Sequence, residues 1–161
     1  MNWDVYSKLL LKECPQDFVS YCVPGARFVS MRETQFQTRA KSAYRPREMR
    51  GDTLIEAELH DQHFLIHVEW QSDKDGEMDM RLLGYCYEAT RLHKLPVLSV
   101  VIYLQAVSDT PKGPLDQRIP TGRRLLWFDF DSLEIREQPV EGFRQLNLDA
   151  FCLTTTHKSL C

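Results

Sequence analysis

The sequence predicts one α/β domain, in an α+β arrangement with a central mixed β-sheet flanked by helices. Two observations carry this prediction. The apolar residues have helical spacing near the N-terminus, alternate from Asp52 onwards, and return to helical spacing after Gly76. A short apolar run at 96–104, rich in β-branched residues, has the composition of a central strand buried on both faces. The 161 residues fit a single domain, 1–161.

The N-terminal part predicts a helix followed by a basic segment. Asp4 to Tyr21 has approximately helical apolar spacing, which Pro15 breaks and Pro24-Gly25 ends. From Arg27 to Arg50 the periodicity is weak, and seven basic residues stand against two acidic ones although the chain has a net charge of −3. This segment either neutralises phosphates of a nucleic acid or forms a solvated loop face.

The middle of the chain predicts a β-hairpin. Residues 52–59 and 63–71 are strand-like, and the intervening 60–63 (His-Asp-Gln-His) is a plausible short turn. In the second strand the apolar and polar side chains alternate, so they point to opposite faces. A hairpin folded near Asp61 would place the first residue of the first strand beside the last residues of the second strand.

The C-terminal part predicts a helix and two further strands. Glu77 to Lys94 has apolar residues at helical spacing, with Asp75 as a candidate N-cap. The buried strand at 96–104 follows, then a Pro/Gly loop over about 108–122 and a last strand at 125–130.

Cysteine usage and hydropathy indicate a soluble cytoplasmic protein. The five cysteines are odd in number and scattered, without a CxxC pair, which favours a reducing compartment. The longest apolar run, Leu95 to Leu104, is about half the length that a membrane-spanning helix needs. We therefore expect no membrane partner.

Asp52, Glu69 and Gln71 form the pattern that carries a chemical prediction. The hairpin brings Asp52 beside Glu69, and Gln71 shares a face with Glu69 because residues i and i+2 of a strand point the same way. Carboxylate oxygens suit Mg²⁺ or Mn²⁺. Such an ion lowers the pKa of bound water and stabilises charge at a scissile phosphate.

Other residues on the same strand faces leave alternatives open. His63 and His67 share a face with Glu69, which allows a zinc site, although no fourth ligand suggests itself. Glu56 and Glu58 share a face with Asp52 and are either spare ligands or solvated strand residues. Arg81, on the next helix, could meet a phosphate or pair with Asp75 or Glu77.

The chain resembles the Rpn family of recombination-promoting nucleases, transposase-like proteins of the PD-(D/E)XK superfamily. The resemblance lies in four features. An Asp opens one strand (Asp52), and the next strand ends in His-Val-Glu-Trp-Gln (residues 67–71). The following helix carries an Arg and a Tyr (Arg81 and Tyr85), and a Pro-Val…Val-Val-Ile-Tyr-Leu strand comes after it (residues 96–104).

The resemblance implies a restriction-endonuclease-like core and a set of site residues. Asp52 and Glu69 would be the metal ligands, and Gln71 would stand in the place of the superfamily's catalytic lysine. Gln can orient water by hydrogen bonds but cannot act as a base. Glu33 is the nearest candidate for an additional helix acid. The DNA backbone would be contacted by basic residues of the segment before the hairpin and of the helix after it, namely Arg45, Arg47, Arg50 and Arg81.

Two functions follow as hypotheses. The first is a Mg²⁺- or Mn²⁺-dependent DNA endonuclease that hydrolyses phosphodiester bonds, linked to recombination or transposition; double-strand cleavage with one site per chain would call for a homodimer. The second is a degraded or truncated nuclease-fold relic that binds DNA or a protein. Gln71, the net charge and a tail (NLDAFCLTTTHKSLC) that departs from the family pattern favour the second.

Overall fold

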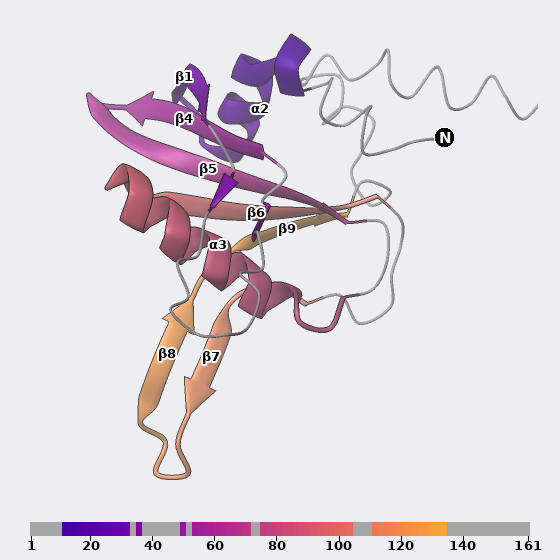
Figure 1. The fold of residues 1–161 in the computed structure, drawn as a ribbon, viewed down its shortest axis with the longest axis vertical. Helices are drawn as coiled ribbons and strands as arrows, with labels where there is room; N and C mark the ends of the chain where they lie inside the picture. The colour runs from indigo at the N-terminus through magenta and orange to yellow at the C-terminus, as the bar shows by residue number, and fades with distance from the viewer. Residues whose placement is uncertain are drawn as a thin grey trace, which may run out of the picture.

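A five-stranded mixed β-sheet with a helix on each face forms the body of the protein (Figure 1). The computed structural model describes residues 11–32, 35–36, 49–50, 53–71, 75–104 and 111–134. The strand order is β1-β4-β5-β6-β9, with bounds β1 Arg27–Arg32, β4 Thr53–Leu59, β5 Gln62–Gln71, β6 Val97–Tyr103 and β9 Asp131–Glu134. The predicted fold class, a mixed sheet flanked by helices, is confirmed.

The β4–β5 hairpin has the predicted place and a tight turn. Its antiparallel register runs from Leu59 opposite Gln62 to Thr53 opposite Val68. The two turn residues, His60 and Asp61, both have positive φ values of 51° and 59°. Two consecutive left-handed residues match the right-handed twist of the flanking strands, as in a type I′ turn.

β5 is buried on both faces because a different helix covers each of them. Ile66 and Val68 pack on the side of α2 (Pro15–Cys22), with Trp70 at the margin of the same cluster. Leu65 packs on the other side, against Tyr85 of α3 (Met78–His93). The alternation predicted from the sequence is therefore confirmed.

Three parallel strands end at one edge of the sheet. β5 pairs with β6, and β6 pairs with β9, so that Gln71, Tyr103 and Glu134 are in register. The amide of Leu104 donates to the carbonyl of Gln71 at 2.9 Å, which extends the pairing to the last residue of β5. Carboxyl ends of parallel strands are the usual place for a site in such sheets.

A β-ribbon that the sequence did not predict projects from this body (Figure 1). β7 (Leu115–Arg118) lies within the expected 108–122 loop and pairs antiparallel with β8 (Arg124–Phe128). The loop prediction is wrong here because Pro and Gly bracket a strand of only four residues. The predicted 125–130 strand ends at Phe128 and lies outside the main sheet.

The edge strand β1 was not predicted either, because the charged residues at its ends interrupt the alternation of apolar and polar side chains. It pairs antiparallel with β4, with a register shift between Phe28 and Ser30. A further pairing joins β2 (Gln35–Phe36) to β3 (Met49–Arg50).

Both helices begin and end close to the predicted signals. The break at Pro15 is confirmed, since α2 starts there, and Gly25 follows its end with a φ of 87°. The N-cap of α3 is Glu77 and not Asp75, although the Asp75 carboxylate accepts a hydrogen bond from the Glu77 amide at 2.9 Å. Over the described ranges, no helix has the length and apolar character needed to cross a membrane.

Replacing Asp61 with Gly should stabilise the protein. An L-residue at a φ of 59° carries a steric cost that Gly does not. After the entropy that Gly adds to the unfolded chain is subtracted, we expect a gain of about 0.5 kcal/mol, measured by urea unfolding. Asp61→Val should destabilise, because a β-branched residue is disfavoured at positive φ. Equal unfolding midpoints for the two variants would contradict the described turn.

Candidate functional site

Glu69 is a buried carboxylate close to the carboxyl end of β5, on the face covered by α3. Its side chain is 4% exposed, and one oxygen forms an ion pair with the Nη2 of Arg81. The other guanidinium nitrogen, Nη1, lies 2.5 Å from an oxygen of Asp75. Arg81 therefore joins two carboxylates, one from the end of β5 and one from the residues just before α3. A charge buried to this degree requires such a partner.

The electrostatics of this cluster favour its charged form. Burial alone would lower the pKa of Arg81, but the hydrogen bond to Asp75 and the charge of Glu69 raise it above its ordinary value. The pKa of Asp75 lies below its usual range, first because its carboxylate accepts a hydrogen bond from the Glu77 amide and second because the Arg81 cation faces it. Arg81 thus stays a cation and Asp75 an anion across the physiological range.

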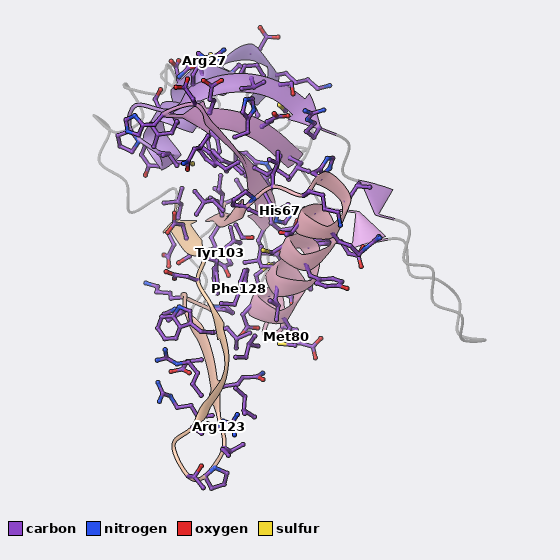
Figure 2. All side chains as sticks on the ribbon, turned by 90° about the vertical axis from the view of Figure 1, so that its left-hand side faces the viewer. Arg27, His67, Met80, Tyr103, Arg123 and Phe128 are labelled. Carbon is purple, nitrogen blue, oxygen red and sulfur yellow. The ribbon has the colours of Figure 1, made fainter. Side chains whose placement is uncertain are left out.

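His67 lies beneath this ion cluster, between the sheet and α3 (Figure 2). It is fully buried, and its ring centre is 4.9 Å from that of Tyr85. Burial, assisted by the positive charge of Arg81, lowers its pKa to about 4. Its Nε2 is 3.8 Å from Glu69, beyond hydrogen-bond distance. His67 is therefore a neutral packing residue.

Tyr103 ends β6 beside Gln71 and adds a buried hydroxyl to the same edge. The residue is 1% exposed. Burial raises its pKa to about 12, and the charges of Asp75, Glu134 and Asp79 act in the same direction. Lys112 approaches Glu134 to 3.8 Å. Carboxylates from three segments therefore lie near this edge, and two of them, Asp75 and Glu134, are paired with Arg81 and Lys112.

Asp75, Tyr103 and Glu134 were not predicted as site residues. The signal that could have identified them is their position, since Tyr103 and Glu134 end strands and Asp75 stands just before a helix. Using that signal for Glu134 required knowing that β9 is parallel to β6, which the sequence did not indicate.

The two other acids on this sheet face belong to a separate cluster. Glu56 is 4% exposed and forms contacts with Arg32 and with the Nδ1 of His63, at 2.7 Å for the histidine. Glu58 pairs with Arg27. The expectation of solvated strand residues is therefore wrong for Glu56, because Arg32 of β1 and His63 of β5 pair with its carboxylate.

The predicted site residues are only partly within the described ranges. Glu69, Gln71 and Arg81 lie there, and Arg81 takes the expected alternative of pairing with Asp75. Arg50 belongs to β3, of which the backbone alone is described. The remaining predicted residues lie outside the described ranges, namely Asp52, Glu33, Arg45 and Arg47. In the parts of the chain that the structure describes, no group of three His, Cys, Asp or Glu residues could hold a metal ion, so the zinc set of His63, His67 and Glu69 is not assembled.

Comparison with models of known protein families gives no match for this chain, and neither does a search of curated proteins.

Removing the Arg81 guanidinium should destabilise the protein, because the buried Glu69 would lose its counter-charge. Arg81 is itself 40% exposed, so we discount the loss for a fully buried pair to about 2 kcal/mol for Arg81→Ala. The double variant Glu69→Gln/Arg81→Ala should recover part of this loss, since no buried charge remains unpaired. If the double variant lost as much unfolding free energy as the two single variants together, measured by chemical unfolding, the ion pair would be contradicted.

Acid should weaken the fold through His67. Its pKa falls from an ordinary value of 6.5 to about 4 on folding, so the unfolded chain binds the proton more tightly. The contribution is complete above about pH 6.5 and is lost as the pH falls towards 4, by roughly 1.4 kcal/mol per unit. The unfolding free energy of His67→Phe, measured from pH 7 to 4, should lack this part of the slope. An unchanged slope would show that His67 does not titrate in this way.

Proposed function

We propose that this protein is a divalent-metal-dependent, DNA endonuclease-like enzyme that hydrolyses phosphodiester bonds. The observation that carries the proposal is the buried carboxylate of Glu69 close to the carboxyl end of β5, in a sheet where three parallel strands end together. Burying an anionic side chain is costly, and functional sites are where proteins most often retain such groups.

The hairpin register supports Asp52 as the second acidic ligand. Thr53, the first described residue of β4, stands opposite Val68. Asp52 precedes Thr53 in the chain, so strand pairing continued by one residue would bring it opposite Glu69. In a strand it would also share a face with Leu54, which packs on the α3 side where Glu69 lies.

The donor set fits a hard cation. Both proposed ligands, Asp52 and Glu69, offer carboxylate oxygens, as Mg²⁺ and Mn²⁺ prefer. When bound, such an ion would supply an activated water and stabilise the charge of the phosphate. Gln71 would orient that water through its amide, because a carboxamide has no basic group at neutral pH.

Arg81 would change partners in this proposal. The Glu69 oxygen that is paired with Arg81 would have to release the guanidinium before that oxygen could bind a cation, whereas Asp75 can hold Arg81 in place. The half-exposed guanidinium, still anchored by Asp75, would then contact a phosphate oxygen of the DNA, the role expected from the sequence. Arg45, Arg47 and Arg50 remain proposed backbone contacts, and Glu33 a proposed further acid.

Broader features of the proposal rest on the family resemblance. A role in recombination or transposition, a cytoplasmic location and a homodimer for double-strand cleavage belong to it.

A catalytically degraded relic is the second candidate, and a specific contact favours it. Arg81 already neutralises Glu69, so the carboxylate is satisfied without a metal ion. With Gln71 in the place of a lysine, the cluster would then be a structural ion pair in a DNA- or protein-binding module. Titration with Mn²⁺ separates the two candidates, since only the enzyme should bind it through Glu69.

The nuclease proposal predicts nicking of supercoiled plasmid with Mg²⁺ or Mn²⁺ and its loss with a chelator. Glu69→Gln should reduce nicking at least about a hundredfold, because one of two metal ligands is removed. Glu58→Gln is the matched control, since this acid lies on the same sheet face but pairs with Arg27. The assay is the rate of conversion to open-circular DNA. Nicking that survives in Glu69→Gln, or no Mn²⁺ binding by the wild type, would reject the enzyme.

A further inference from the structure

The β7–β8 ribbon carries an unusual set of exposed side chains. Leu125 and Trp127 are 62% and 48% exposed, although both are large and apolar. Asp116 pairs with Arg118 and Arg124, and the Arg124 guanidinium stacks 4.1 Å above the Trp127 ring. Stability of the body does not account for these exposed residues, and exposed apolar and charged groups gathered together mark binding surfaces.

One face of the ribbon contacts the body, and the other face is exposed. Leu115 packs in the cluster of Met78 and Leu82, and the Gln117 amide approaches the sulfur of Met80 to 3.9 Å. The alternation of a strand turns Asp116 and Arg118 the other way, towards Trp127, which pairs with Asp116 in the register. The outward face therefore carries Arg118, Arg124 and Trp127.

The charge of the ribbon is opposite to that of the chain. Residues 115–128 contain three arginines and one aspartate, a net charge of +2, whereas the chain has −3. Arg123, close to the tip in Figure 2, has no side-chain hydrogen bond or ion pair within the described ranges. A guanidinium that has no ion-pair partner among the described residues, beside two that share one carboxylate, is complementary to a row of phosphates.

The base of the ribbon is held firmly. Phe128 and Phe130 are buried in the same cluster as Met78, with their rings 5.7 Å apart. A Cβ on Gly113 would come within 2.3 Å of the Phe130 carbonyl oxygen, so the two segments touch through their backbones. Isolated two-stranded hairpins are marginally stable, and this anchoring gives the projecting part a fixed direction.

We propose that the β7–β8 ribbon is a DNA-binding arm that enters the major groove of a duplex, with Arg118, Arg123 and Arg124 on phosphates. A two-stranded ribbon fits the major groove of B-form DNA, whereas the corresponding groove of A-form RNA is too narrow for side chains to read. The inference deepens the proposed function and rests on it, because it takes DNA as the ligand. The Met80 contact sets the arm beside the helical turn that bears Arg81, so bound DNA would lie near the site.

The test is equilibrium binding of the full-length protein to a short fluorescent DNA duplex, followed by anisotropy in the presence of a chelator so that no cleavage occurs. Arg123→Gln should weaken binding roughly fivefold at about 0.1 M salt. It should also reduce the slope of log affinity against log salt by about one. The control is Arg91→Gln, which removes the same charge at the other end of α3 and should leave both quantities unchanged.

Several outcomes would contradict the proposal that the ribbon is a DNA-binding arm. These are wild-type protein that binds no duplex, Arg123→Gln that binds as the wild type does, and equal affinity for duplex RNA. A dimer that Leu125→Ser dissociates without a change in DNA affinity would assign the face to a second copy of the chain instead. If Arg123→Gln loses affinity while the wild type cleaves nothing, the arm stands and the nuclease proposal fails. If the wild type cleaves DNA but its binding does not depend on Arg123, the nuclease proposal stands and the arm fails.

Discussion

The pairing of β5 with a neighbour on each side is the constraint on which the rest of the structure depends. β4 approaches antiparallel and β6 parallel, so β5 has no free edge, and a helix covers each of its faces. Every side chain of its second half must then pack or be paired. This is why one strand holds both the apolar residues of two clusters and two polar residues buried under α3, His67 and Glu69.

The buried charge of Glu69 explains how the neighbouring elements are arranged. A carboxylate in this position needs a cation, and the first turn of α3 supplies Arg81. Arg81 in turn is held by Asp75, whose carboxylate also accepts the amide of Glu77 at the start of the helix. One chain of contacts thus connects the end of β5 with the beginning of α3. In the proposed metal site Glu69 gives up its contact with Arg81, whereas in the proposed relic it keeps that contact.

The sequence predicted the fold where one signal dominates and failed where signals compete. Alternation in β5 and the β-branched run of β6 located both strands, since both are central and buried. β7 was missed because neighbouring Pro and Gly residues masked it, and β1 because arginines occupy its ends. Glu69 was singled out by its place at the end of the second hairpin strand, and Arg81 by its place on the helix that follows. Glu134 was not, because its place depends on β9 returning parallel to β6, a long-range pairing with no local pattern.

The bulge and the two arginines of β1 bear on how the molecule behaves at high concentration. In the described sheet β1 is an outer strand, with a register shift between Phe28 and Ser30 and with Arg27 and Arg32 tied to acids of β4. An outer strand exposes peptide groups on which another chain can add a strand. The bulge distorts that ladder, and charged ends oppose a second strand. The register shift and the arginines of β1 are therefore features that disfavour edge-to-edge pairing with another sheet.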